Sequence, residues 1–265
     1  MFTAQHYVVP STLDEAYMLN QKPKSTVLGG CGWLKMGRRQ IGTAIDLSAL
    51  GLDKIEEYED RFELGAMVTL RQIETHAGLQ AAFGACLRES VAHIVGVQFR
   101  NCATIGGSIW GRFGFSDPLT CLLALGASVR LHQAGVVPLS AFAAMPYDRD
   151  LLVAVILPKA GQRAVYLTHR ASATDFPVLA AAVCRRADGT YCAAVGARPQ
   201  RAVLVEDTQN LLANGVTEES ARAFAEDAAE RLTFASNLRG SADFRAHLCR
   251  VLVRRAAVSL EEGHA

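Results

Sequence analysis

Ala103-Thr104-Ile105-Gly106-Gly107-Ser108-Ile109 lies in the middle of the sequence, and Leu28-Gly29-Gly30-Cys31-Gly32-Trp33-Leu34 lies near its start. Each run follows an apolar stretch of the residue types that favour β-strands. Paired glycines carry no Cβ atom, so the backbone N–H groups beside them can approach an anion closely. One such run alone is also typical of an ordinary turn. Two of them in one chain predict a pair of loops that close on the pyrophosphate of a nucleotide.

The residues around the first run predict a small β-α-β unit. Thr12-Leu13-Asp14-Glu15 has the pattern of a capping box, which opens a helix that runs to about Asn20. Strands are expected over residues 26–28, which lead into the first glycine run, and over residues 45–47.

The residues around the second run predict helices and strands in alternation. A strand from Phe62, a helix capped by Thr69 and a helix over residues 79–94 precede the run, and Pro118 opens a short helix after it. Residues 159–162 form a polar break. Strands are expected over 129–131, 136–137 and 152–157, followed by a hairpin that turns at Asp188-Gly189. Helices are expected over 218–232 and 243–260.

Composition excludes several classes of protein. The chain has 265 residues and a net charge of +1, from 27 basic and 26 acidic residues, so a nucleic-acid partner is not expected. The seven cysteines form no C-x-x-C pair, which argues against a disulfide framework, a structural zinc site or an iron–sulfur cluster held by this chain alone. The sequence lacks an export signal and an apolar run long enough to span a membrane, so a location in the cytoplasm is expected.

The second glycine run is followed by Ser116-Asp117-Pro118 and then by Leu122-Leu123-Ala124-Leu125-Gly126-Ala127. This order resembles the FAD-binding (medium) subunit of molybdenum hydroxylases, the family of the xanthine dehydrogenase, carbon monoxide dehydrogenase and 4-hydroxybenzoyl-CoA reductase flavoproteins. The first run occupies the place of that family's first pyrophosphate loop. Shorter matches follow in the family's order and extend the likeness over nearly the whole chain: Ile45-Asp46-Leu47, Leu64-Gly65-Ala66-Met67-Val68-Thr69-Leu70, Arg100-Asn101-Cys102-Ala103, Val137-Pro138-Leu139, Leu157-Pro158, Asp175-Phe176 and Val195-Gly196-Ala197-Arg198-Pro199.

The resemblance implies an α+β fold. Residues 1–160 are expected to form a two-subdomain FAD-binding domain of the PCMH or vanillyl-alcohol-oxidase type, with subdomains at about 1–56 and 57–160. Residues 163–265 are expected to form a smaller α+β C-terminal domain. FAD is expected to bind non-covalently in the crevice between the parts.

The resemblance also implies a set of cofactor-binding residues. Backbone N–H groups of residues 29–33 are expected on one side of the pyrophosphate, and Thr104, Gly106 and Gly107 on the other. Asp117 is expected to accept hydrogen bonds from ribityl or ribose hydroxyls, although Ser-Asp-Pro is also an ordinary helix entry. Because the flavin carries out its own redox chemistry, no catalytic side chain and no metal ligand is expected. The full set of candidates is Leu28, Gly29, Gly30, Cys31, Gly32, Trp33, Ala103, Thr104, Ile105, Gly106, Gly107, Ser108, Ser116, Asp117, Leu152 and Val153.

Several positions depart from the family's pattern. The family usually has Ser or Thr where this chain has Cys31 and Gly32, Asn where it has Ser108, and a basic residue near Thr168. The first two departures affect the hydroxyl contacts to phosphate that the family pattern implies. The last affects the expected protein partner of the flavin ring. Trp110 and Arg112 are also large where the family alternates small and bulky residues, so they are candidates for narrowing the site or for covering the surface.

The resemblance implies a function in electron transfer. Electrons would leave a substrate at the molybdopterin centre of a large subunit, pass through the 2Fe-2S clusters of a small subunit, and reach FAD on this chain. FAD would then reduce NAD⁺ or another acceptor.

Two alternatives are open at this point. One is a stand-alone flavin reductase that resembles UDP-N-acetylenolpyruvoylglucosamine reductase, which uses a serine acid and a glutamate, a constellation that the sequence does not display. The other is a scaffold subunit that has kept the fold and lost FAD, which the departures at Cys31, Gly32, Ser108 and Thr168 leave open.

Overall fold

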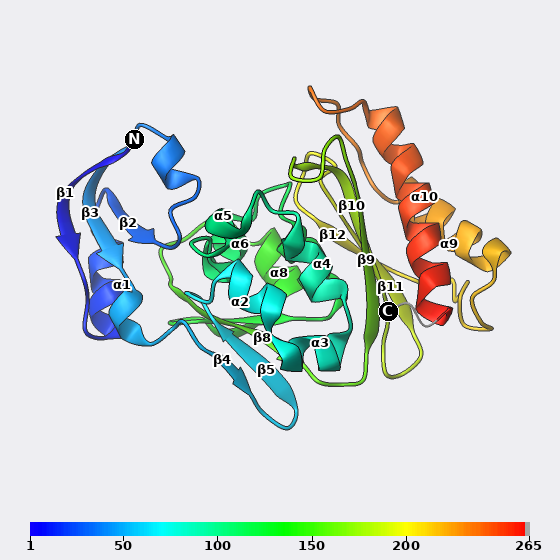
Figure 1. The fold of residues 1–265 in the computed structure, drawn as a ribbon, viewed down its shortest axis with the longest axis horizontal. Helices are drawn as coiled ribbons and strands as arrows, with labels where there is room; N and C mark the ends of the chain where they lie inside the picture. The colour runs from blue at the N-terminus through cyan, green and yellow to red at the C-terminus, as the bar shows by residue number, and fades with distance from the viewer. Residues whose placement is uncertain (263–265) are drawn as a thin grey trace.

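The computed structural model describes residues 1–262, which form three parts in a row (Figure 1). A small three-stranded sheet at the N-terminus lies at one end, a five-stranded sheet with most of the helices lies in the centre, and a four-stranded sheet with two helices lies at the other end. The α+β class predicted from the sequence is confirmed.

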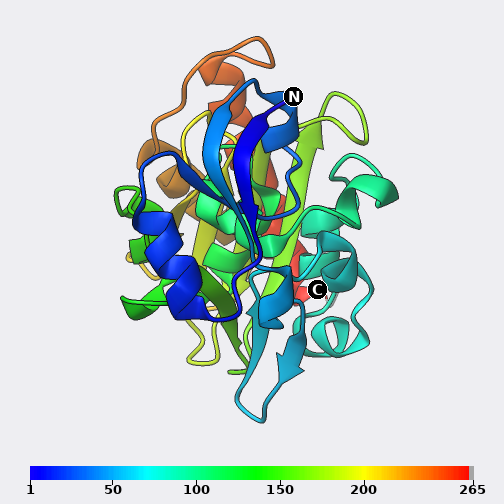
Figure 2. The ribbon, with the colours of Figure 1, turned by 90° about the vertical axis from the view of Figure 1, so that its left-hand side faces the viewer.

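The N-terminal part is a parallel sheet with one flanking helix (Figure 2). Its strands are β1 (Thr3–Val8), β2 (Ser25–Leu28) and β3 (Gln40–Asp46), in the order β1-β3-β2, and α1 (Leu13–Gln21) connects β1 to β2. The Thr12 hydroxyl accepts from the Glu15 N–H at 3.1 Å, as expected for a cap. The Glu15 carboxylate, however, accepts from the Ser11 N–H at 2.8 Å, so the predicted capping box is only half formed.

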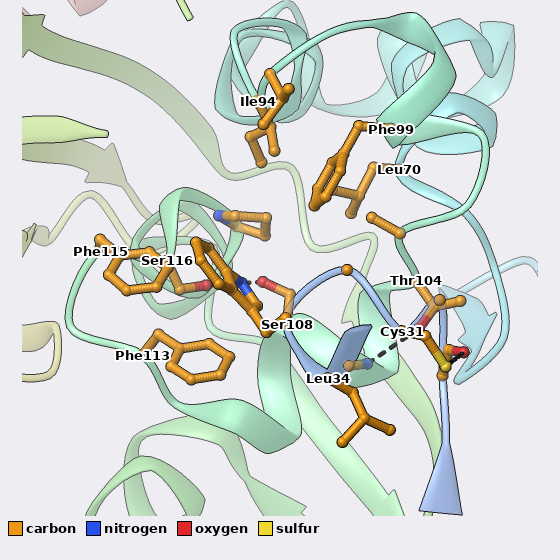
Figure 3. A pocket seen from close by; sticks show the side chains of 18 of the residues that line it. Cys31, Leu34, Leu70, Ile94, Phe99, Thr104, Ser108, Phe113, Phe115 and Ser116 are labelled. Carbon is orange, nitrogen blue, oxygen red and sulfur yellow. Dashed lines mark hydrogen bonds between the residues drawn. The ribbon is translucent and has the colours of Figure 1, made fainter. Parts of the chain in front are cut away.

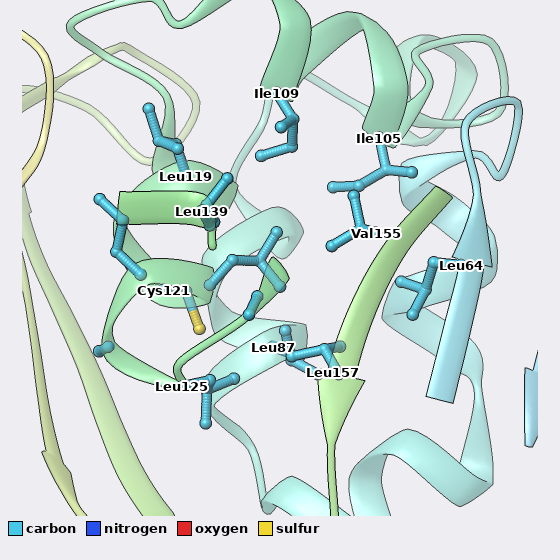
Figure 4. Close-up of a cluster of buried hydrophobic side chains, with 14 of the residues drawn as sticks. Leu64, Leu87, Ile105, Ile109, Leu119, Cys121, Leu125, Leu139, Val155 and Leu157 are labelled. Atoms are coloured by element: carbon cyan, nitrogen blue, oxygen red, sulfur yellow. The ribbon is translucent and has the colours of Figure 1, made fainter. Parts of the chain in front are cut away.

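The central part is an antiparallel sheet covered by short helices. Its strands follow the order β4-β5-β8-β6-β7, with bounds β4 (Ile55–Glu57), β5 (Arg61–Gly65), β6 (Ser128–Leu131), β7 (Gly135–Pro138) and β8 (Leu152–Pro158). The helices are α2 (Leu70–Thr75), α3 (Ala77–Phe83), α4 (Cys86–Ala92), α5 (Val97–Arg100), α6 (Ile105–Gly111), α7 (Asp117–Ala124) and α8 (Leu139–Ala144). Figure 4 shows the core between them, where side chains of α6 and α7 meet those of β5 and β8.

Two details of this part differ from the sequence prediction. The single helix expected over residues 79–94 is broken at Gly84, whose φ of 65° ends α3 before α4 begins. The second glycine run does not follow a strand and is not an open loop. It follows α5, and Gly106 and Gly107 lie in the first turn of α6.

The C-terminal part is an antiparallel sheet with helices on its outer face. The strands are β9 (Arg163–Arg170), β10 (Pro177–Arg185), β11 (Tyr191–Gly196) and β12 (Val203–Glu206), in the order β12-β11-β10-β9. Helices α9 (Glu218–Glu230) and α10 (Ala242–Glu261) cover one face (Figure 1), and α7 of the central part packs on the other. Because β10 is covered on both faces, it is an almost continuous apolar run.

The chain crosses from the central sheet to the C-terminal sheet at residues 159–162, between β8 and β9. Within the described residues, no helix has the length and apolar character needed to cross a bilayer.

Candidate functional site

The two glycine segments lie against each other. A Cβ atom on Gly30 would lie 1.8 Å from the carbonyl oxygen of Cys102, and one on Gly29 would lie 2.8 Å from the Thr104 hydroxyl oxygen. Real Cβ atoms do not approach other atoms so closely, so both positions require glycine. The segment that follows β2 is thereby held against the start of α6, although the contacting residues lie more than 70 positions apart in the sequence. The sequence prediction that both runs contribute to one place therefore agrees with the packing.

The backbone donors of the two segments are used differently. In the part of the chain that the structure describes, the N–H groups of residues 30–33 donate to no protein acceptor. By contrast, the N–H of Gly106 donates to the Ala66 oxygen at 2.9 Å, and the N–H of Gly107 donates to the Thr104 hydroxyl at 3.2 Å. The first segment therefore offers free donors to an anion. The N–H groups of Gly106 and Gly107 are already bonded within the protein, so they are not available to an anion.

Two adjoining cavities meet at this junction. The first has a volume of about 450 Å³ and is lined mainly by apolar side chains, and the second has a volume of about 550 Å³ and is more polar. Figure 3 looks into the first cavity, with Phe113 and Phe115 on one side and Leu70 and Phe99 on the other. Both cavities are lined by the same six residues where they meet: Thr26, Val27, Gly29, Arg39, Thr104 and Gly107.

Most of the predicted site residues line these cavities. The first cavity is lined by Gly29, Gly30, Cys31, Gly32, Trp33, Ala103, Thr104, Gly107, Ser108, Ser116 and Asp117. The second is lined by Leu28, Gly29, Thr104, Gly106, Gly107 and Leu152. Ile105 and Val153 line neither, since Ile105 is buried in the central core and the Val153 carbonyl accepts from the Ala66 N–H at 2.8 Å.

Asp117 forms a buried ion pair that joins the central part to the C-terminal part. The Arg170 guanidinium donates to Asp117 Oδ1 at 2.6 Å, and the Tyr166 hydroxyl donates to the same oxygen. The Asp117 and Arg170 side chains are only 4% and 8% exposed. Burial raises the pKa of Asp117, although the charge of Arg170 opposes this. Its predicted role as an acceptor for sugar hydroxyls stays a prediction, and the structure shows Oδ1 engaged with protein donors.

The neighbouring hydroxyls are also engaged with each other. Ser116 Oγ accepts from the Leu119 N–H at 3.2 Å and so caps α7, as the helix-entry interpretation expects. It also lies 2.9 Å from the hydroxyl of Ser108, the residue that replaces the family's usual Asn. Figure 3 shows these two side chains together at the cavity wall.

Four aromatic rings close one end of the first cavity, and together they form the aromatic cluster: Trp33, Phe113, Phe115 and Phe176. Trp33 stacks on Phe176 at 5.3 Å between ring centroids, and Phe113 stacks on Phe115 at 5.2 Å. Trp33 is 44% exposed, so it is a wall of the cavity rather than a filler of the core. The other tryptophan, Trp110, packs beside Phe142 and lines the second cavity.

Cys31 lies in the first glycine segment, and its thiol is hydrogen-bonded to a backbone carbonyl. Its φ of 55° is unusual for a residue with a side chain, and its thiol donates to the Gly29 carbonyl at 3.3 Å. Burial is the main reason that the pKa of the Cys31 thiol is raised. A raised pKa favours the neutral thiol, which is a poorer nucleophile than the thiolate. The non-covalent attachment of FAD stays a prediction.

Sequence reasoning missed three residues that line the first cavity. Arg170 is only two positions beyond Thr168, where the family's basic residue was sought, and Thr168 itself lines a separate hollow beside α10. Phe176 lies in the quoted match Asp175-Phe176 but was given no role. Arg39 was not among the candidate residues; its side chain is exposed, and it lines both cavities.

Comparisons with known proteins cover both parts of the sequence. Residues 2–160 match the sequence model of the family described as FAD binding domain in molybdopterin dehydrogenase. Residues 163–260 match the family described as CO dehydrogenase flavoprotein C-terminal domain. The nicotine 6-hydroxylase medium subunit of Paenarthrobacter nicotinovorans is 27% identical over 281 residues, with 96% of each chain covered. The uncharacterized protein YgfM of Escherichia coli is 26% identical over 94% of this chain and 93% of its own.

Solved structures show the same fold. A chain of the carbon monoxide dehydrogenase from Hydrogenophaga pseudoflava that lacks the Mo-pyranopterin moiety superposes with a TM-score of 0.88 at 24% identity, with 98% of each chain covered. A chain of quinoline 2-oxidoreductase from Pseudomonas putida 86 gives a TM-score of 0.85 at 22% identity, over 100% of this chain and 99% of that one.

Proposed function

This chain belongs to the family of FAD-binding subunits of the molybdenum hydroxylases, and from that premise we propose that it is the electron-transfer subunit of a heteromeric complex. Its cofactor is FAD. In the proposal, a molybdopterin-binding large subunit oxidises the substrate, and a small 2Fe-2S subunit passes the electrons to this chain. The bound FAD then passes them to NAD⁺ or another acceptor. We infer the two partner subunits from the family resemblance and from the name of the Paenarthrobacter relative, which is a medium subunit.

The observation that carries the proposal is the junction of the two glycine segments. Unpaired N–H groups at residues 30–33 are donors that a diphosphate can satisfy, and Gly29 and Gly30 leave no side chain in its way. The two cavities on either side of the junction have the size that ligand sites commonly have. An extended dinucleotide would have its diphosphate at the junction and one half in each cavity.

The chain's residues bind and shield the cofactor rather than carry out acid–base chemistry. FAD accepts and donates electrons when bound, and this chemistry belongs to the flavin. Asp117 is held by Arg170 and Tyr166, and Cys31 holds its proton, so neither is set up to transfer a proton. Apolar side chains and the aromatic cluster line the first cavity and would shield the bound cofactor from water.

The structure offers no support for the two alternatives. Within residues 1–262 no glutamate lines either cavity, so the pair of a serine and a glutamate that a stand-alone reductase uses is not assembled there. The departures at Cys31 and Gly32 leave the backbone donors in place. A Cβ atom at position 32 would lie 2.6 Å from the ring of Phe99, so the glycine there fits the packing.

The proposal predicts the behaviour of the purified chain. After incubation with FAD and removal of excess, it should retain one flavin per chain, measured by absorbance and by mass spectrometry of the released cofactor. The isolated chain should show no hydroxylase activity, and substrate-driven reduction of its flavin should require both partner subunits. A chain that stays colourless in excess FAD would contradict the proposal, and so would substrate oxidation by this chain alone.

A further inference from the structure

Arg39 has a fixed backbone and a free side chain. It lies directly before β3, and its carbonyl oxygen accepts from the N–H of Thr3 at 3.1 Å, which ties this point of the chain to β1. Its side chain lines both cavities, beside Gly29 and Gly107 at the junction. Arg39 and its neighbour Arg38 are both exposed, but Arg38 lines neither cavity.

The other charged groups of the first cavity are already paired. Asp117 is paired with Arg170 at 2.6 Å, and Asp175 is paired with Arg239 at 3.1 Å. Arg39 has no carboxylate within ion-pair distance and no hydrogen-bond acceptor for its guanidinium among residues 1–262.

In the second cavity the charged side chains are held by backbone groups. The Arg149 guanidinium donates to the carbonyl oxygens of Asn20 and Lys22, each at 2.7 Å. The Asp150 carboxylate accepts from backbone N–H groups, among them that of Ala134 at 2.9 Å, and the Asp148 carboxylate accepts from the Asp150 N–H at 3.0 Å. Arg39 therefore brings a positive charge without a protein partner to the place where the cavities meet.

We infer that Arg39 is a cofactor-binding residue that pairs with the diphosphate of FAD. The inference rests on the proposed function, because it assumes that FAD occupies the junction. A diphosphate carries two negative charges, whereas the N–H groups of residues 30–33 supply only partial positive charges. A guanidinium supplies a full charge and a planar pair of donors that fits phosphate oxygens. None of the sequence motifs that indicated the site included this residue.

The test compares four proteins, the wild type, Arg39→Gln, Arg39→Lys and Arg38→Gln, in titrations that follow flavin fluorescence. Each is titrated with FAD and with riboflavin, which lacks phosphate, and the FAD titration is repeated at several salt concentrations. Arg39→Gln should weaken FAD binding about tenfold, equivalent to about 1.4 kcal/mol, and leave riboflavin binding unchanged. The salt dependence of FAD affinity should become shallower, since one ionic contact is lost. Arg39→Lys should recover part of the affinity, and Arg38→Gln should behave as the wild type.

The outcomes separate this inference from the proposed function. If the wild type binds FAD and Arg39→Gln binds it equally well with the same salt dependence, the inference is overturned and the proposed function stands. An equal loss of FAD and riboflavin affinity would also overturn it, because the effect would then not depend on phosphate. If the wild type does not bind FAD, the proposed function is overturned, and the inference about Arg39 is overturned with it.

Discussion

Replacing Gly30 with alanine should lower the affinity for FAD by about 100-fold, equivalent to about 2.7 kcal/mol. The added Cβ would be built 1.8 Å from the Cys102 carbonyl oxygen and 2.6 Å from Ala103 Cα, so the two glycine segments must separate. Both contacts are with backbone atoms, which cannot rotate out of the way as a side chain can. Residues 30–33 and their N–H groups would then be displaced from the start of α6. Titration with FAD, followed by flavin fluorescence, measures the loss.

Gly37→Ala is the matched control for this substitution. Gly37 lines the same cavity, its φ of −87° suits any residue, and the nearest atom to a Cβ there is the Leu34 oxygen at 3.5 Å. We expect this variant to bind FAD as the wild type does. Circular dichroism would show whether Gly30→Ala keeps its fold. A folded Gly30→Ala that binds FAD as tightly as Gly37→Ala would contradict the site described here.

Replacing Arg170 with methionine should destabilise the protein by about 3–5 kcal/mol at neutral pH, the range observed when one partner of a buried ion pair is removed. The substitution leaves the Asp117 carboxylate buried without its cation, since both side chains are less than a tenth exposed. Denaturant unfolding at pH 7 measures the loss. Arg186→Met is the control, because the pair that Arg186 forms with Glu206 is 34% and 42% exposed and should contribute less than about 1 kcal/mol.

The same variant has an expected pH dependence. Burial already raises the pKa of Asp117 in the folded protein, and loss of Arg170 should raise it further. The folded state then holds a proton that the unfolded state releases, so stability falls as the pH rises from the ordinary pKa of the carboxyl to its folded value. The difference in unfolding free energy between the wild type and Arg170→Met should therefore become smaller on acidification. Adding Asp117→Asn to this variant should recover part of the lost stability. A difference in unfolding free energy that stays constant with pH would contradict this explanation.

The sequence predicted the elements whose burial follows a clear pattern. The apolar strands 26–28 and 152–157 lie within β2 and β8, and the Thr69 cap lies at the start of α2. The strand β1 was missed because five of its six residues are exposed, which leaves no alternation to detect. The prediction of one continuous helix over residues 79–94 is wrong, because the positive φ of Gly84 ends α3 despite the helical spacing of the apolar residues.

The candidate site was predictable where it depends on local sequence and not where it depends on tertiary contacts. A glycine run permits a close approach of the backbone, and the structure brings both runs to one junction. The pairing of Asp117 in α7 with Arg170 in β9 joins positions 53 residues apart, so no spacing in the sequence indicates it. The aromatic cluster likewise takes its rings from the first glycine segment, the connection between α6 and α7, and the connection between β9 and β10.

The most direct test of the central claim is a crystal structure of the chain with FAD. The account predicts that the diphosphate lies between residues 30–33 and the Thr104 end of α6, with one half of the dinucleotide in each cavity. A diphosphate bound elsewhere on the chain, or a dinucleotide folded entirely into one cavity, would contradict it.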